Sequence, residues 1–485
     1  DVIGVFSAAG LFDHHGEQVV GDVSILINGI AHKSCLVRRL RDHTRRGVTR
    51  VLVLATGGCK GMRALEERVQ PSSSVCMTEA LTRFPPTRTA ALERLNRFVP
   101  HAGRDYAARR NYDLGRDGHN GVSTLSPYIR ARLLSEADVL DATLSRHSPG
   151  SAEKFVQEVY WRTYWKGWLE MRPAVWGQYK TALKGALDNV QTQSGLRDRW
   201  EDACKGATDI DCFNVWAKEL VETGYVHNHA RMWFASIWIF TLRLPWELGA
   251  DFFLRHLLDG DPASNTLSWR WVAGIQTPGK TYPARTSNIS KYTEGRFAPK
   301  WQLAGEAHAL SGPPKPDVMP LPHADMPVPT ARTGLVLHDD DLSPGFILDA
   351  GIQPVATAVM TTRSGLSPLT VTPHVTAFAN AAAEDTVARF GTRLGDVARV
   401  SPTGDALAAW ARDAGVDQIV TAYAPAGPAA DVLSRLQNLE GTVPVRRVRR
   451  SYDCSAWPHA THGFFRFKEK IPHLLAELRG LRAAE

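Results

Sequence analysis

Apolar and polar positions along this chain fall into stretches of distinct texture. Over residues 1–84, apolar runs at 2–6, 23–30 and 51–55 are separated by polar, Arg-rich stretches. Short apolar runs bounded by polar turns are typical of buried strands that alternate with helices. We therefore predict an N-terminal α/β segment over residues 1–84.

The pattern changes after residue 84, where apolar residues recur every three or four positions. This spacing places them on one face of a helix and predicts a mostly α-helical domain over residues 85–310. The clearest helical stretches are 153–171, 213–222, 228–243 and 248–258.

A second change follows the helical domain. Residues 311–331 hold seven prolines, which fix φ and remove backbone donors, so we expect an extended linker there. Over residues 332–485, strand and helix patterns alternate, which predicts a doubly wound parallel α/β domain. The expected strands are 334–337, 354–359 and 417–422, and the expected helices are 375–391, 404–414 and 428–437. The predicted fold class is therefore multidomain α and α/β.

Composition excludes several classes of protein. With 44% hydrophobic and 22% charged residues, the chain has the balance of a soluble globular protein, and its longest apolar stretch, 232–242, is too short to span a membrane. The six cysteines form no C-x-x-C pair, so a disulfide scaffold and a cysteine-rich metal site are disfavoured. A net charge of +7 permits a polyanionic partner. Tryptophan is unusual, because 11 of the 14 lie between residues 161 and 271.

The first candidate site lies in the predicted helix 153–171. Glu158, Trp161, Arg162 and Trp165 are three or four positions apart and share one helix face. A carboxylate, a flat indole and a guanidinium together can stack on and hydrogen-bond a planar polar ligand such as a nucleobase. A core aromatic stripe with an i,i+4 ion pair explains the same pattern, and periodicity alone favours that alternative.

Three further stretches contain residues that can have a structural or a functional role. His227 and His229 are two positions apart and fall on different helix faces, so no metal site is predicted. Asp259 and Asp261 lie in the sequence Asp-Gly-Asp-Pro, which is typical of a turn. The stretch 123–128, Ser-Thr-Leu-Ser-Pro-Tyr, is typical of a helix N-terminus, which can also bind a pyrophosphate.

Two weaker candidates remain. The glycine-rich stretch 56–61 follows an apolar run but lacks the spacing of a phosphate-binding loop, so a simple turn is favoured. The basic run 446–450 is interpreted as a solvated face or strand edge, with a phosphate contact as the alternative.

Together and in order, the main candidate stretches of the helical domain resemble the FAD-binding helical domain of the DNA photolyase/cryptochrome family. The matching segments are Ser123-Thr-Leu-Ser-Pro-Tyr, Glu158-x-x-Trp161-Arg162, Gly224-x-x-His227-Asn228-x-x-Arg231-Met232, Asp259-Gly-Asp261-x-x-x-Asn265-x-x-x-Trp269-Arg-Trp271 and Arg285-x-x-Asn288.

The resemblance implies a U-shaped FAD in a helical bowl, beside a pocket that accepts a flipped-out base lesion. The residues implied to bind the cofactor are Tyr106, Ser123, Leu125, Ser126, Arg162, Asn228, Arg231, Asp259, Asp261 and Asn265. The residues implied to form walls of the substrate pocket are Trp161, Met232 and Trp271. The residues implied to act in catalysis are Glu158 and Asn228 at the lesion, and Trp269 and Trp246 as electron carriers.

Several departures from the family pattern accompany the resemblance. The outer tryptophan of the family's electron-transfer chain would fall near Gln193, where no tryptophan stands, and Trp200 or Trp216 is a candidate replacement. His229 stands where the family usually has Arg. No cysteine quartet follows the helical domain, so the iron–sulfur branch of the family is disfavoured.

The order of the domains also departs from the family, which places its antenna-type α/β domain before the helical one. Here residues 332–470 resemble that domain, so the chain resembles a circularly permuted member. Whether this domain binds an antenna chromophore, and which one, is left open by the resemblance. The family offers no explanation for residues 1–84.

The sequence thus leaves three functions open. The first is a light-driven, FAD-dependent photolyase that splits pyrimidine dimers in damaged DNA. The second is a cryptochrome-like photosensor without repair activity, and the third is a structural subunit that keeps the fold and binds a protein partner through residues 1–84. We expect no membrane association, and a cytoplasmic or nucleoid location if the source is bacterial; the compartment itself is not encoded in any recognisable signal.

Overall fold

A computed structural model describes residues 79–482, which all lie within one compact unit. The predicted N-terminal segment 1–84 therefore lies almost wholly outside the described residues, and so does the glycine-rich stretch 56–61. Within residues 79–482, no helix is long and apolar enough to cross a membrane.

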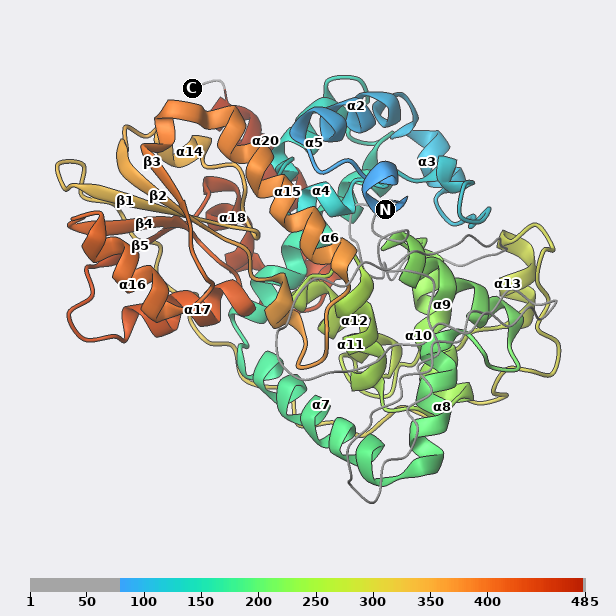
Figure 1. Ribbon diagram of the computed structural model, residues 1–485. Helices are drawn as coiled ribbons and strands as arrows, with labels where there is room; N and C mark the ends of the chain where they lie inside the picture. Colours follow the sequence, from blue (N-terminus) through green and yellow to red (C-terminus); the bar gives the residue numbers. More distant parts are fainter. Residues whose placement is uncertain (1–78, 483–485) are drawn as a thin grey trace, which may run out of the picture. The chain divides into compact units, whose positions relative to one another are not determined.

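The first part of the described chain is helical, as its apolar spacing predicted (Figure 1). Its α-helices are α2 (Arg88–Phe98), α3 (Arg104–Arg109), α4 (Ser126–Arg130), α5 (Glu136–Leu144), α6 (Glu153–Glu170), α7 (Ala174–Thr192), α8 (Ser194–Lys205), α9 (Asp211–Thr223), α10 (Asn228–Ser236), α11 (Trp246–His256), α12 (Pro262–Val272) and α13 (Thr286–Tyr292). Short turns η1 (Val99–His101) and η2 (His119–Gly121) lie between them, and a π-helical turn, η3 (Ile237–Thr241), directly follows α10.

Local chemistry explains where several of these helices begin and end. Ser135 and Asp138 form a reciprocal capping box at the start of α5, which satisfies two backbone donors. Gly224 ends α9 at a φ of 69°, a left-handed conformation that a side chain would strain. The expected helix 228–243 is confirmed as α10 and η3. The backbone hydrogen bonds change from the α-helical to the π-helical pattern at Ile237.

The second part of the chain is a doubly wound parallel sheet, which confirms the predicted fold class. Its elements are β1 (Thr333–His338), α14 (Gly345–Leu348), β2 (Pro354–Met360), η4 (Arg363–Leu366), α15 (Pro373–Phe390), η5 (Gly391–Leu394), β3 (Asp396–Arg399), α16 (Gly404–Asp413), β4 (Gln418–Ala422), α17 (Pro428–Gln437), β5 (Val445–Val448), α18 (Ser451–Ala456), η6 (Trp457–His459), α19 (Phe464–Lys468) and α20 (Ile471–Arg482). The strand order is β3-β2-β1-β4-β5, and every pairing is parallel.

The two faces of this sheet bury different partners. Val336 of β1 belongs to a core cluster with Leu407 of α16 and Leu433 of α17. Its neighbour Leu335 belongs to the main core, which also includes Phe378 of α15 and extends into the helical part. Because successive side chains of a strand point to opposite faces, one face is covered by α16 and α17 and the other by α15 and the helical part.

The segment between the two parts runs without helix or strand from residue 305 to residue 328. It is held along the edge strand β5, where Asp325 N donates to Arg447 O at 3.0 Å and Arg447 N donates to Asp325 Oδ2 at 2.9 Å. The basic run 446–450 therefore lies at the sheet edge, which is one of the positions the sequence suggested.

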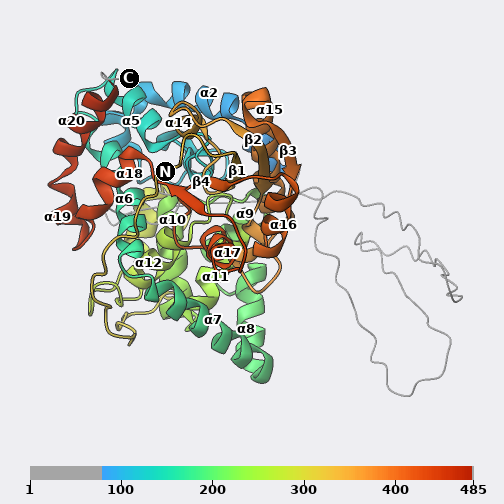
Figure 2. The ribbon, with the colours of Figure 1, turned by 90° about the vertical axis from the view of Figure 1, so that its left-hand side faces the viewer.

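The C-terminal elements pack on α6 of the helical part. Figure 2 shows α18, α19 and α20 beside α6, and residue contacts join α6 to α18, η6 and α19. Gly167 makes this approach possible, because a Cβ at that position would lie 2.9 Å from the Cα of Trp457. The helix that carries the first candidate site is thus sandwiched between the helical core and the C-terminal elements.

Candidate functional site

A buried ion pair joins α10 to the turn between α11 and α12. Arg231 donates from Nη1 and Nη2 to the two carboxylate oxygens of Asp259, at 3.0 and 2.9 Å, and from Nε to Val226 O at 2.8 Å. Ser126 at the start of α4 donates its Oγ–H to Asp259 at 2.5 Å. All three side chains are buried, so this bidentate pair holds one full positive charge in a fixed position inside the helical part.

The same turn places a second carboxylate, Asp261, among cations. Asp261 accepts from Ser264 N at 2.8 Å and so caps α12, which has Pro262 in its first turn. It also lies 3.5 Å from Arg162 and 3.7 Å from Arg130. Burial alone would raise the pKa of Asp261, but the cations that surround it outweigh burial and lower the pKa below its usual range.

The backbone just before α4, where the sequence predicted a helix N-terminus, is strained. Thr124 has a φ of 50°, which is a rare conformation for a β-branched residue. Arg94 reaches the site from α2 and donates to Thr124 Oγ1 at 2.5 Å. Strained residues persist where the surrounding structure over-determines them, and they are concentrated at ligand sites. Ser123 and Ser126, which the resemblance assigns to the phosphates, flank this residue on either side.

Unsatisfied polar atoms surround these groups. Asn228 Oδ1, Asn265 Oδ1 and Arg162 Nη1 are buried and have no hydrogen-bond partner among the described residues. Asn265 donates its amide to Ala250 O at 2.8 Å, which fixes the direction of the unpaired oxygen. Leaving such groups unpaired costs about 1–3 kcal/mol each, so they favour a polar ligand. Amide and guanidinium groups match the ring edges and phosphates of FAD, so the residues present fit this cofactor.

Glu158 of α6, the residue that the resemblance assigns to the lesion, has a cationic partner. It forms a buried ion pair with Arg110, which follows α3. Burial would lower the pKa of Arg110, but Glu158 outweighs it and raises that pKa. Burial and Glu158 both raise the pKa of Tyr106, which is therefore a neutral phenol. No local pattern in the sequence indicated Arg110, because it lies 48 positions before Glu158.

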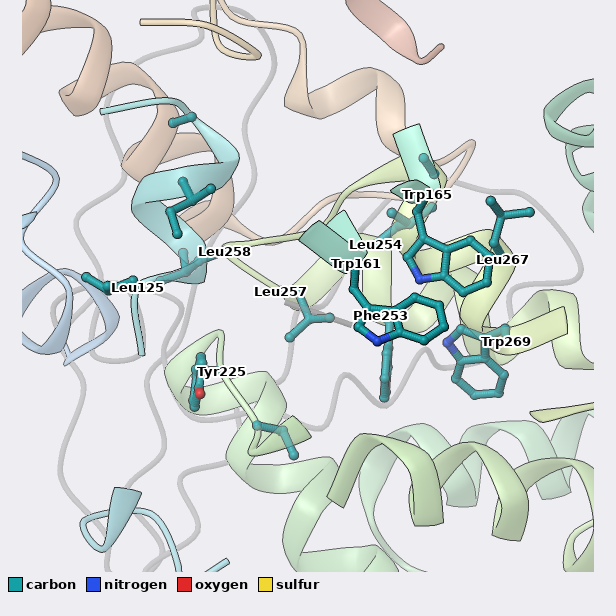
Figure 3. Close-up of a cluster of buried hydrophobic side chains, with 14 of the residues drawn as sticks. Leu125, Trp161, Trp165, Tyr225, Phe253, Leu254, Leu257, Leu258, Leu267 and Trp269 are labelled. Atoms are coloured by element: carbon teal, nitrogen blue, oxygen red, sulfur yellow. The ribbon is translucent and has the colours of Figure 1, made fainter. Parts of the chain in front are cut away.

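The three predicted pocket walls have different neighbours. Trp161 is stacked on Phe464, with ring centroids 3.6 Å apart and an angle of 12° between the planes. Trp271 is half-buried and packs on Tyr282 at 5.5 Å, while Met232 is buried. Figure 3 shows Trp161 and Trp165 pointing from α6 toward Trp269.

The two predicted electron carriers belong to different aromatic groups. Trp269 is fully buried against Trp238 at 6.2 Å. A Cβ at Gly249 would lie 2.3 Å from the Trp269 ring, so α11 and α12 can approach this closely only with glycine there.

Trp246 contacts Tyr179 at 5.7 Å, and Tyr179 in turn stacks on Trp176 at 5.1 Å. Of the suggested replacements for the missing outer tryptophan, Trp216 instead stacks on Trp233 at 5.4 Å. The aromatic neighbours of Trp246 thus come from α7, whose role the sequence did not indicate.

His227 and His229 are both buried. Burial lowers the pKa values of His227 and His229 well below the usual range, so both are neutral. Among residues 79–482, no group of three or more metal-ligating side chains is assembled.

Residues of the α/β part reach the turn that carries Asp259 and Asp261. The carbonyl of Gly260 accepts from Arg130 Nε at 2.8 Å and from Arg363 Nη1 at 3.2 Å. Arg130 also pairs with Asp340, and Arg363 pairs with Asp339 at 2.8 Å. These carboxylates follow β1. Buried ion pairs and hydrogen bonds therefore join the α/β part to the candidate cofactor site.

The helical part also contacts the loop after β4, at the carboxyl end of the sheet where doubly wound proteins usually bind ligands. Glu170, the last residue of α6, accepts from Tyr423 Oη at 2.5 Å and from Ala426 N at 2.6 Å.

Parts of the chain are similar to known proteins. Residues 155–301 match the family model described as the FAD binding domain of DNA photolyase. A deoxyribodipyrimidine photo-lyase of Streptomyces griseus is 33% identical over 178 residues, which cover 36% of this chain and 37% of that protein. The enzyme of the same name from Escherichia coli is 24% identical and is matched over 56% of each chain. The chain thus covers between about a third and somewhat more than half of the length of these relatives.

Among solved structures, a bacterial class III photolyase from Agrobacterium tumefaciens is 25% identical, with a TM-score of 0.37, over 48% of this chain and 47% of that one. A Synechocystis cryptochrome is also 25% identical, with a TM-score of 0.33, over 43% and 42% of the two chains. Residues 155–301 are therefore similar to the FAD-binding domain of DNA photolyase, and parts of the chain are similar to deoxyribodipyrimidine photo-lyases.

Proposed function

We propose that this protein is an FAD-dependent enzyme that uses light to split pyrimidine dimers in DNA. The observation that carries the proposal is the buried Arg231–Asp259–Ser126 group, which lies among buried amides and a guanidinium that lack partners. When bound, FAD absorbs light and donates an electron to the dimer. The chain itself must bind the cofactor, hold a cation beside it and place the lesion against it.

Arg231 supplies the fixed cation in this proposal. Its two bonds to Asp259 and its bond to Val226 O leave it little freedom to rotate, so its charge is held in place. A buried cation of this kind would stabilise negative charge on a reduced flavin, and Asp259 balances it when that charge is absent. Asp261 and Asn265 would hold the flavin ring, and Ser123, Leu125 and Ser126 would hold the phosphates.

Glu158 and Asn228 bind the lesion in this proposal. Arg110 holds Oε1 of Glu158 and so fixes the orientation of the carboxylate within the buried site. Asn228 begins α10 and has a buried, unpaired amide oxygen available for a ligand. Trp161, Met232 and Trp271 form the walls against which the dimer stacks, in a site where an extruded base is read by stacking and edge contacts.

The proposal is tested by measuring, in the dark, how tightly the protein binds damaged and undamaged DNA. The flavin-loaded protein is titrated with a single-stranded oligonucleotide that contains one thymine dimer and with the same strand undamaged. We expect at least about tenfold tighter binding of the damaged strand, equal to about 1.4 kcal/mol. Equal affinity for the two strands would contradict the proposed substrate even if flavin is bound.

A photosensor without repair activity is the second candidate, and the Glu158–Arg110 pair favours it. Because the carboxylate already has a buried cationic partner, a substrate has to compete with Arg110 for it. A sensor would retain flavin and respond to light, yet leave dimers intact when illuminated in the reduced state. A protein partner that binds through residues 1–84 belongs to this alternative as well as to the structural-subunit hypothesis.

A further inference from the structure

The wall of the site formed by Trp161 is completed by a residue from the C-terminal end of the chain. Phe464 lies parallel to the indole, 3.6 Å away between centroids, and the two residues are 5% and 7% exposed. Phe464 belongs to α19, which follows the sheet and is separated from Trp161 by about 300 positions in the sequence.

The short helix α19 is fixed on α6 by contacts of its own. Phe467 is fully buried and packs on Tyr164 at 5.5 Å and Tyr160 at 6.1 Å. Tyr164 donates its hydroxyl to His462 O at 2.7 Å, just before the helix begins. Phe464 and Phe467 are three positions apart and both face α6. The contacts of Phe467 therefore also hold Phe464 in place against α6.

The other ring contacts of Trp161 do not hold its plane in the same way. Tyr164 meets it edge-on at 83° and Trp165 is tilted by 38°, and both come from the same helix as Trp161. Among the described residues, Phe464 is the aromatic ring that lies parallel to the indole. Figure 3 shows Trp161 in a cluster of buried side chains with Trp269 and Leu125, so Phe464 backs an indole that lies among candidate site residues.

We propose that Phe464 is a positioning residue of the substrate pocket, which holds the Trp161 indole in the plane on which a flat pyrimidine dimer stacks. This inference rests on the proposed function. Without a parallel ring behind it, the indole can turn about its χ2 angle, and a stacked ligand must then restrict that rotation at a cost in affinity. The helical part would therefore bind its substrate fully only with the C-terminal elements in place.

The neighbouring residue provides a matched control. Phe465 is on the same short helix but is 82% exposed. Phe464→Leu keeps the apolar volume and removes the flat ring, Phe464→Tyr restores a flat ring, and Phe465→Leu makes the same change away from the stack. All three variants are made in the full chain and are loaded with flavin.

Two measurements are made on each variant. The first is the dark affinity for the dimer-containing oligonucleotide and for its undamaged counterpart. We expect Phe464→Leu to reduce the preference for the dimer by about 3- to 10-fold, the range that aromatic pair energies imply, without loss of flavin. Phe464→Tyr and Phe465→Leu should keep the wild-type preference.

The second measurement is the fluorine NMR spectrum of protein that carries 5-fluorotryptophan, with the Trp161 resonance identified by Trp161→Phe. Phe464→Leu should shift this resonance and Phe465→Leu should not. An unshifted resonance in Phe464→Leu would overturn the stack itself. A wild-type preference in Phe464→Leu, or an equal loss in both leucine variants, would overturn the positioning role. Absence of any preference in the wild-type protein would instead overturn the proposed function, and the positioning role with it.

Discussion

At the scale of single residues, Arg231 is the group on which the cofactor site depends most. Replacement by Gln leaves Asp259 buried without its charge partner, and breaking a buried pair in this way costs about 3–5 kcal/mol. We expect Arg231→Gln to lose flavin during purification and Arg231→Lys to retain part of it, because Lys keeps the charge but not the bidentate geometry.

The measurement is the flavin absorbance per mole of purified protein, with Arg399→Gln as the control. Arg399 pairs with Glu384 at the surface, so its loss should change neither flavin content nor stability noticeably. Full flavin content in Arg231→Gln would show that the cation is not needed to bind the cofactor.

The proposed contact between Glu158 and the lesion gives a second prediction for a single residue. Glu158→Gln removes the charge that pairs with Arg110 but keeps the shape of the side chain. We expect flavin to remain bound and the rate of dimer splitting to fall about tenfold or more, because a charged hydrogen bond to the lesion is lost.

The control is Glu153→Gln in the first turn of the same helix, where Glu153 pairs with Lys468 at the surface. Glu153→Gln should repair dimers at the wild-type rate. Loss of flavin in Glu158→Gln would mean that this residue belongs to the cofactor site rather than to the substrate pocket.

At the scale of elements, the contact between α6 and η6 sets how closely the C-terminal elements approach the site. We expect Gly167→Ala to destabilise the protein by about 1–3 kcal/mol, because its Cβ would press on the backbone of Trp457 at 2.9 Å. Gly185→Ala in α7 is the control, since a Cβ there meets open space and alanine favours helix by about 1 kcal/mol.

Thermal and urea unfolding measure both variants. The account predicts opposite signs, with Gly167→Ala less stable and Gly185→Ala slightly more stable than the wild type. Equal stability of Gly167→Ala and the wild type would mean that α6 and η6 are not in close contact in solution.

The helices and strands differ in how well the sequence predicts them. Helices with a strong apolar period, such as α16 and α17, were predicted within about one residue because burial of one face imposes the period. The edge strand β3 was not identified, because its residues are exposed or half-buried and show no apolar run, and β5 was indicated only by one of the two interpretations of the basic run 446–450. The pairing of Trp246 with α7 was also missed, since aromatic neighbours distant in sequence leave no local pattern.

At the scale of the whole molecule, buried ion pairs join the helical and α/β parts. Asp341 after β1 accepts two bonds from Arg450, both at 2.7 Å, and lies 3.3 Å from Arg132 of the helical part. Burial would raise the pKa of Asp341, but these two guanidinium groups outweigh it and lower the pKa from 3.8 to about 2.

This shift predicts a pH dependence of stability. Because the folded protein lowers the pKa, the carboxylate stabilises the fold above pH 3.8, and this contribution is lost as the pH falls toward 2. We expect Asp341→Asn to reduce the free energy of unfolding near neutral pH by at least about 2 kcal/mol, with a difference from the wild type that shrinks between pH 4 and 2.

Urea unfolding at a series of pH values measures the difference. Asp349→Asn is the control, because Asp349 is exposed in its pair with Arg393 and should change stability by less than about 0.5 kcal/mol. A pH-independent difference for Asp341→Asn would contradict the lowered pKa.

The packing of the whole molecule brings residues to the site that the sequence alone did not predict. The motifs led to Arg231, Asp259 and Asp261, because each lies in a short local pattern that the family shares. Arg363 and Phe464 reach the site only because the sheet and its C-terminal helices pack against α4, α6 and the α11–α12 turn. Such contacts depend on the fold of residues far apart in the chain, so no spacing within the sequence reveals them.

The proposed light-driven repair of DNA is tested by illuminating the flavin-loaded protein with a damaged oligonucleotide. Purified protein, loaded with FAD and chemically reduced, is illuminated with an oligonucleotide that contains a single thymine dimer, and the strand is then analysed by chromatography. The account predicts restoration of the undamaged strand in the light and none in the dark. Intact dimers after illumination of the flavin-loaded, reduced protein would contradict it and favour the photosensor.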